Sequence, residues 1–422
     1  MTYPPILARL LAQSGLAAML PWVLRLTEGG AGALPYYSDD LLGAACPELA
    51  EVLPLQQPAP AAVLDLATAG PRCPLPPAEL PDCYEPAPVG GLPALKLTAA
   101  DHLRKSSGLT VQPSSEVLIT SGVAGALVLA LGALVNRGDR IVLFDPASPL
   151  YRLAARHRLA RVRWVRTWVE DGVTRFDPLQ LIDAMRGARL VVVNSPANPT
   201  GGVFAPEALE QIAWWADRRD VLIFNDEALQ AFRTGPAASI AVQPRAVDRT
   251  LTAGSVSKGC GLPALRVGWL AGHRQLIRPC LLHAATQWQS VPTMCQEAAL
   301  AALKQDADAY APMHDLLNAR RQMVQERLQA LHLNVTPATT GCHLWVNVGK
   351  LGLTGEHFAD LLLHSQKVLV WPGHHFGPAS RDCVRLSCAG DEVSLRKGLA
   401  RLGACVRQLR ATGSAAVSKW AA

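Results

Sequence analysis

The chain has 422 residues, of which 50% are hydrophobic and 18% are charged, and its formal net charge is +6. This balance is ordinary for a folded protein of two or three domains, and it excludes collagen-like repetition and a mainly disordered chain. The arginines behind the positive charge are scattered rather than clustered, which argues against a nucleic-acid-binding surface.

The N-terminal residues 10–24 are apolar enough to resemble the core of a signal peptide. Arg9 is the only cation before this stretch, and Gln13 and Pro21 interrupt it, so we expect no secretion signal. No stretch reaches the ~20 uninterrupted apolar residues of a membrane-spanning helix, and no membrane partner is expected. The ten cysteines form no C-x-x-C pair, which favours a reducing, cytoplasmic compartment.

Residues 1–60 are expected to form an irregular N-terminal arm belonging to a smaller domain, and the Pro-rich residues 54–93 disfavour long regular elements. From about residue 100, short apolar runs alternate with helical patterns. We expect strands over residues 117–120, 140–144, 190–193, 221–224, 250–253 and 267–270. Apolar strands separated by helices predict a mainly parallel sheet covered on both faces, in a large α/β domain over residues 61–305.

The clearest helix begins at Pro206, a residue that suits the first helical position, and it carries Leu209, Ile212 and Ala216 on one face. After about residue 310 the pattern changes to a long helix, then short strands over residues 343–348, 368–371 and 383–387. A closing helix begins after a predicted N-cap at Asp391. Together these elements predict a smaller α+β domain over residues 306–422.

Polar segments containing glycine or proline follow three of the apolar strands directly. The sequence N-S-P-A-N-P-T-G occupies residues 194–201, N-D-E occupies 225–227, and G-S-V-S-K occupies 254–258. Ligands of parallel α/β sheets gather at the carboxyl ends of the strands. We therefore expect these segments to meet, together with Arg266.

In this order, N-P-T-G, then D-E, then S-x-S-K with an arginine eight residues later, the segments resemble the class I/II aminotransferases. That group consists of fold-type-I enzymes that depend on pyridoxal 5'-phosphate. The resemblance extends from about Asp65 to Leu409. It implies a Schiff base between the cofactor and Lys258, chemistry at the α-carbon of an amino acid, and a homodimer with its active site between the two domains.

The chemistry of this cofactor gives each residue type a reason. A lysine amine whose pKa is lowered can condense with an aldehyde and carry a proton, the catalytic role expected of Lys258. Asp226 is expected to pair with the ring nitrogen, and Asn198 to donate to the ring phenolate oxygen. The phosphate needs backbone amides at a helix N-terminus with hydroxyl and guanidinium donors, and the candidates are Gly122, Val123, Ala124, Ser255, Ser257 and Arg266.

Three further roles are implied by the resemblance alone. Arg385 follows a Pro-Gly and Phe-Gly pattern and takes the place of the arginine that holds the substrate α-carboxylate. Gly70 resembles the glycine that passes over the substrate, and Tyr84 the tyrosine that reaches the neighbouring subunit's phosphate. The adjacent His374 and His375 are not expected to bind a metal, because neighbours on a strand point to opposite sides.

The sequence departs from the family pattern at the predicted cofactor ring. Leu229 stands where a tyrosine usually bonds the cofactor phenolate, and Ala147 and Ser148 stand where an aromatic residue usually stacks on the ring. Tyr151 follows, but would need a shifted loop to take that place. Ala264 replaces a glycine near the phosphate arginine. The ring environment that selects among transamination, elimination, decarboxylation and oxidation is therefore altered.

The leading functional hypothesis is transfer of an amino group between an α-amino acid and a 2-oxo acid. The alternative is a pyridoxal-phosphate lyase, cyclase or annulating enzyme acting at the β- or γ-carbon with a second small-molecule substrate. Residues 257–263 and the long N-terminal arm favour it, because they are similar to the subgroup of capreomycidine synthase. A third reading, the effector domain of a transcription regulator, needs a helix-turn-helix that the first sixty residues do not resemble.

Overall fold

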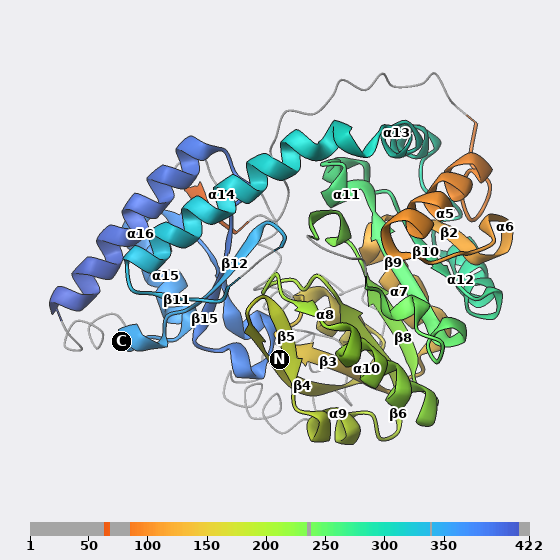
Figure 1. The fold of residues 1–422 in the computed structure, drawn as a ribbon, viewed down its shortest axis with the longest axis horizontal. Coiled ribbons are helices and arrows are strands. Elements are labelled where there is room, and N and C mark those ends of the chain that lie inside the picture. The colour runs from red at the N-terminus through yellow and green to blue at the C-terminus, as the bar shows by residue number, and fades with distance from the viewer. Residues whose placement is uncertain (1–62, 68–84, 234–237, 338–339, 413–422) are drawn as a thin grey trace, which may run out of the picture.

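The protein is described from a computed structural model, which covers residues 63–67, 85–233, 238–337 and 340–412. A large sheet with its helices lies beside a smaller sheet packed by the C-terminal helices (Figure 1). The predicted N-terminal arm, Gly70 and Tyr84 lie outside the described residues. Within the described residues, no helix combines the length and the apolarity needed to cross a bilayer.

The large sheet is mainly parallel, as predicted. Within the described residues it has nine strands, in the order β2 (Val117–Thr120), β10 (Gly268–Gly272), β9 (Thr250–Ser255), β8 (Leu222–Asp226), β6 (Ala188–Asn194), β3 (Arg140–Asp145), β4 (Arg161–Glu170), β5 (Val173–Phe176) and β7 (Val203–Phe204). β10 runs antiparallel to both of its neighbours, and β5 runs antiparallel to β4. The other neighbouring strands pair in parallel.

All six strands expected in this sheet are present, but β4, β5 and β7 were not predicted. β4 alternates exposed and half-buried residues along most of its length, so it lacks the continuous apolar run that identified the central strands. β5 and β7 lie at the edge of the sheet and are short. A search for fully apolar runs therefore finds the centre of a parallel sheet and misses its edge.

Helices cover both faces of the large sheet. Successive residues of its central strands point to opposite sides, so they pack on different helices. In β6, Leu190 and Val192 pack with α7 (Gly122–Leu134), α8 (Pro149–His157) and α12 (Arg274–Gln287). The intervening Val191 and Val193 pack with α9 (Pro178–Ala184) and α10 (Pro206–Arg218). The short α6 (Pro113–Glu116) leads into β2.

Two further helices, α5 (Pro93–Ser107) and α13 (Thr293–Leu303), pack on the hydrophobic cluster that also includes residues of the smaller domain. The beginning of α5 lies within the first hundred residues, where irregular structure was expected. Its Pro93 occupies the start of the helix, where a missing N–H costs nothing. At this position a proline-rich sequence therefore precedes the beginning of a helix and does not prevent helix formation.

The smaller sheet is antiparallel, with the order β11 (Asn334–Val335), β12 (His343–Asn347), β15 (Cys383–Ser387) and β14 (Trp371–Pro372). The helices α14 (Ala311–Ala330), α15 (Gly355–Gln366) and α16 (Glu392–Thr412) complete the predicted α+β unit. β1 (Leu64–Asp65) pairs with β13 (Val368–Leu369). This pairing places β1 beside the C-terminal strand β13. The division of the chain into an N-terminal arm over residues 1–60, a large domain over residues 61–305 and a smaller domain over residues 306–422 stays a proposal.

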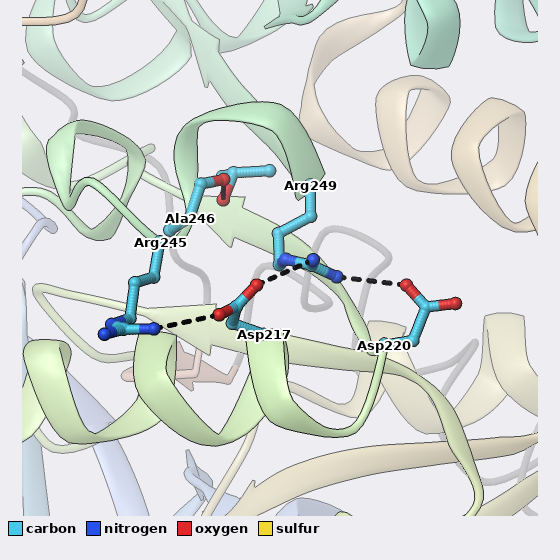
Figure 2. Close-up of polar contacts among 6 residues, drawn as sticks. Asp217, Asp220, Arg245, Ala246 and Arg249 are labelled. Atoms are coloured by element: carbon cyan, nitrogen blue, oxygen red, sulfur yellow. Dashed lines mark hydrogen bonds and ion pairs between the residues drawn. The ribbon is translucent and has the colours of Figure 1, made fainter.

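A network of ion pairs ties α10 to the turn before β9 (Figure 2). Asp217 on α10 accepts hydrogen bonds from Arg245 Nη1 at 3.1 Å and from Arg249 Nη2 at 3.0 Å, and Arg249 Nη1 reaches Asp220 at 3.2 Å. Arg249 directly precedes β9, and the other end of β9 leads to Lys258. The network therefore anchors the far end of the strand that positions this lysine.

Candidate active site

The predicted polar segments meet at one edge of the large sheet. Asn194 at the end of β6 pairs with Asp226 at the end of β8, and Asp226 in turn pairs with β9. Because β10 is antiparallel, it begins at this same edge, where Gly268 pairs with Ser255 on one side and Thr120 on the other. Strand register thus brings together five strand ends, between Thr120 and Gly268, that are far apart in the sequence.

Lys258 lies on the one-turn helix α11 (Val256–Gly259), directly after β9. Burial is the main cause that lowers the pKa of its amino group, and the charges of Arg385 and Arg266 lower it further. Cys342 and Asp226 act in the opposite direction. A lowered pKa enlarges the fraction of neutral amine, the form that attacks a carbonyl carbon or accepts a proton.

Asp226 is a buried carboxylate with two donors of its own. Tyr151 Oη donates to its Oδ2 at 2.6 Å, and the Ala228 N–H donates to its Oδ1 at 2.9 Å. Burial raises the pKa of Asp226, and the hydrogen bond from Tyr151 lowers it. Tyr151, on α8, was considered in the sequence only as a replacement for the stacking aromatic residue. Its hydroxyl instead supports the charged form of the carboxylate.

We expect Tyr151→Phe to weaken cofactor binding about tenfold at neutral pH, equivalent to ~1.4 kcal/mol for one hydrogen bond to a charged group. Losing the hydroxyl raises the pKa of Asp226, since only the charged carboxylate gains from this donor. As the pH is lowered, cofactor affinity should therefore begin to decline at a higher pH in the variant than in the wild type. Cofactor titrations across pH measure this, and superimposable profiles would refute it.

The predicted phosphate site has an arginine packed on a helix N-terminus. The amides of Gly122, Val123 and Ala124 open α7, where N–H groups have no intrahelical acceptor. Gly122 has φ +67°, and a Cβ there would lie 2.8 Å from Arg266 Nη2. Arg266 itself adopts a left-handed backbone with φ 53°, which is uncommon for a non-glycine residue.

Hydroxyl groups complete this donor set. Ser257 Oγ is buried and has no hydrogen-bond partner within the described residues, and Ser255 ends β9 beside the start of β10. An anionic group with several oxygens suits helix amides, a guanidinium and an unpaired hydroxyl together. The residues present therefore fit the phosphate of pyridoxal 5'-phosphate.

Arg385 on β15 is 1% exposed and packs against two aromatic rings, with its guanidinium carbon 4.6 Å from the Trp371 centroid and 5.2 Å from that of Phe376. Nη1 donates to Asn198 Oδ1 at 3.0 Å, and Nη2 donates to Ala67 O at 2.8 Å. Nε has no partner within the described residues. Burial lowers the pKa of Arg385 to about 10, which leaves it charged at neutral pH.

The contact between Asn198 and Arg385 connects the two domains at the site. Because its Oδ1 accepts from Arg385, the amide N–H groups of Asn198 are directed to other acceptors, as the predicted bond to a phenolate oxygen requires. The backbone N–H of Asn198 donates to Asn194 Oδ1 at 2.7 Å, and Asn194 Nδ2 donates to Asp226 O at 2.9 Å. One side chain, Asn194, therefore fixes the spacing of the two predicted ring-binding residues.

A second contact between the domains lies close in sequence to Phe376, one of the aromatic neighbours of Arg385. Asp145, at the end of β3, accepts hydrogen bonds from the Ala379 N–H at 2.7 Å and from Ser380 Oγ at 2.8 Å. Ala379 and Ser380 belong to the 3₁₀ turn Pro378–Ser380. This turn comes shortly after Phe376, whose ring lies on the arginine. The sequence predicts no role for Asp145, because its partners lie more than 230 residues further along the chain.

Two of the positions that depart from the family pattern, Leu229 and Ala147, are buried. Leu229 is 3% exposed and belongs to a hydrophobic cluster shared with the smaller domain, where a Cβ on Gly341 would lie 3.7 Å from its Cδ1. Ala147 and Tyr151 line a cavity of about 20 Å³ that also reaches Asn198. That volume holds about one water molecule.

The structure corrects the geometry expected for His374 and His375. They lie in a 3₁₀ turn over Gly373–Phe376 rather than on a strand, and their ring centroids are 4.0 Å apart. The two side chains therefore lie side by side and do not point to opposite sides, as was expected of neighbours on a strand. Nowhere in the described ranges do three or more His, Cys, Asp or Glu side chains gather as metal ligands would.

The similarity to known proteins extends over most of the chain. A family model described as "Aminotransferase class I and II" matches residues 78–402. An aspartate aminotransferase of Pyrococcus abyssi is 27% identical over 327 residues, which are 76% of this chain and 84% of the relative. A valine–pyruvate aminotransferase of Mycobacterium tuberculosis is 30% identical over 321 residues, which are 74% of this chain and 81% of the relative. The solved aromatic aminotransferase of Pyrococcus horikoshii OT3 superposes with a TM-score of 0.76 at 25% identity, covering 86% of this chain and 99% of that one.

Proposed function

Because the chain belongs to the class I and II aminotransferase family, we propose that it transfers an amino group between an α-amino acid and a 2-oxo acid, with pyridoxal 5'-phosphate held at Lys258. The observation that carries this proposal is the 3.0 Å bond between Arg385 and Asn198. It joins the residue proposed to bind the substrate carboxylate to a residue proposed to bind the cofactor.

Each residue at the sheet edge has a proposed task. Pyridoxal phosphate, when bound, supplies an aldehyde for the amino group and a protonated ring that withdraws electrons from the α-carbon. Asp226, whose charged form gains the hydrogen bond from Tyr151, would hold the proton of the ring nitrogen. Asn198 would hold the phenolate oxygen. The amides of α7, with Ser255, Ser257 and Arg266, would hold the phosphate.

Lys258 and Arg385 would act on the substrate itself. Burial and the neighbouring arginines lower the pKa of Lys258. Its neutral Nζ would therefore accept the proton from the α-carbon and could return it to a different carbon. Arg385 offers its unpaired Nε together with its Nη groups to the α-carboxylate, and its aromatic neighbours exclude water from that pair.

We also propose a cytoplasmic homodimer in which Tyr84 reaches the partner subunit's phosphate site and Gly70 passes over the substrate; both roles rest on the family resemblance. Exposed apolar side chains of the large domain, including Val128 on α7, Leu282 on α12 and Met294 on α13, are compatible with contacts between subunits. Analytical ultracentrifugation of the purified chain tests this, with a dimer as the expected species and a monomer as the contradicting one.

Product analysis tests the reaction type. We expect purified protein, incubated with amino acids and 2-oxo acids, to form one new 2-oxo acid for each new amino acid. Release of ammonia, or a cyclised or condensed product without an equivalent of new amino acid, would instead support the lyase, cyclase or annulating alternative. Leu229 and Ser148, at positions where the family has ring-contacting side chains, are the observation that favours this alternative.

A further inference from the structure

One buried side chain near the proposed site has no polar partner that explains it. His343 is 3% exposed. Within the described residues, the contact of its two ring nitrogens is with Cys342 Sγ, at 4.0 Å from Nδ1 and 3.8 Å from Nε2. The two nitrogens direct their donor or acceptor away from each other, so one sulfur at nearly equal distance satisfies neither of them. A buried polar group in this state points to a ligand.

Strand register places His343 on the same face of the smaller sheet as Arg385. In the antiparallel pair of β12 and β15, Trp345 lies opposite Arg385 and His343 lies opposite Ser387. Opposite residues of paired strands share a face, as do alternate residues of one strand. His343 therefore projects to the side of the sheet from which Arg385 meets the large domain.

The surroundings of His343 keep its ring neutral. Burial is the main cause that lowers the pKa of His343 well below its usual value, and the charges of Arg385 and then Lys258 add to it. The ring thus offers one donor and one acceptor within the electrostatic influence of Arg385 and Lys258. Thr340 holds the strand in place, because its hydroxyl donates to Gly201 O at 2.8 Å in the N-P-T-G segment.

We propose that His343 is a specificity-determining residue that hydrogen-bonds the side chain of the substrate, so that the enzyme acts on amino acids with a short carboxylate or amide side chain rather than an aliphatic one. This inference rests on the proposed amino-transfer function. A substrate bound at Lys258 and Arg385 would place its side chain against His343, and an aliphatic side chain would leave the imidazole unpaired. Sites built to bond a polar substrate group discriminate strongly against analogues that lack it.

Isosteric substrates test the proposal on the cofactor-loaded enzyme. Aspartate and asparagine have the shape of leucine. We expect kcat/KM for the better of these two polar substrates to exceed kcat/KM for leucine at least about tenfold, equivalent to ~1.4 kcal/mol. Aspartate against asparagine distinguishes a carboxylate from an amide. His343→Phe should abolish the preference, whereas His343→Gln, which keeps a neutral donor and acceptor, should retain it.

Binding of non-reactive analogues provides a readout that does not depend on turnover. Succinate, succinamate and 4-methylpentanoate are the deamino forms of aspartate, asparagine and leucine, and calorimetry gives their Kd values. The matched control is His375→Phe, which alters another buried histidine whose lowered pKa owes nothing to Arg385 or Lys258, and which should leave the Kd ratios unchanged.

Two results would overturn the role of His343: a wild-type preference for leucine and 4-methylpentanoate, or equal ratios in the wild type and His343→Phe. The first does not depend on any variant being folded. Failure of the proposed function looks different, because then no amino acid yields a 2-oxo acid, while the Kd ratios still decide the role of His343.

Discussion

Replacement of Lys258 with alanine should lower the amino-transfer rate by about 10⁴-fold or more, the upper range for loss of a positioned proton carrier. The variant loses both the amine that holds the cofactor and the Nζ that moves the α-proton. The measurement is the rate of 2-oxo acid formation at saturating substrate, with cofactor supplied in excess. Lys258 lies on a single helical turn after β9, and circular dichroism of the variant checks that its fold is retained.

Lys96 provides a matched control for this variant. Burial also lowers the pKa of Lys96, but its Nζ donates to Ser114 O at 2.8 Å, near the start of β2 and at the opposite end of that strand from Thr120. Lys96→Ala should retain the wild-type rate. The account is contradicted if Lys258→Ala keeps more than a few per cent of that rate with the cofactor still bound.

Arg385→Lys should raise KM for the amino acid about 30-fold or more, with cofactor content unchanged. A lysine keeps the charge but loses the planar fork, and one charge-assisted hydrogen bond contributes ~2 kcal/mol. It also cannot reach Asn198 Oδ1 and Ala67 O together, as the arginine does. Steady-state kinetics against amino-acid concentration give KM, and absorbance of the bound cofactor gives its content.

A conservative change elsewhere separates carboxylate binding from a general effect of the substitution. Arg401 is exposed on α16 and donates to Gln366 O at 3.1 Å, so Arg401→Lys should leave KM unchanged. If Arg385→Lys also leaves KM unchanged, Arg385 does not bind the substrate carboxylate.

The sheet edge with its lysine could be predicted because each of its parts is local in the sequence. Asp226 and Lys258 come within a few residues of the end of an apolar strand, and Asn198 follows a third strand. Parallel strands present their carboxyl ends at one edge, so their meeting follows from topology without knowledge of side-chain contacts.

Contacts between the domains could not be predicted, because they depend on how the two sheets face each other. The bond from Arg385 to Ala67 O joins residues 318 positions apart, and the bond from Arg385 to Asn198 spans 187. The surroundings of His343 likewise require the register of β12 against β15, which a short apolar strand does not specify. The Tyr151–Asp226 bond depends on the turn after β3, whose shape the sequence left open.

The central claim is that pyridoxal 5'-phosphate is linked to Lys258, and reduction of the purified protein with borohydride tests it most directly. Borohydride converts the carbon–nitrogen double bond between cofactor and lysine into a stable single bond. Mass spectrometry of the digested protein should then find the added mass on the peptide that contains Lys258. Attachment at a different lysine, or a reducible linkage that persists in Lys258→Ala, would contradict the account.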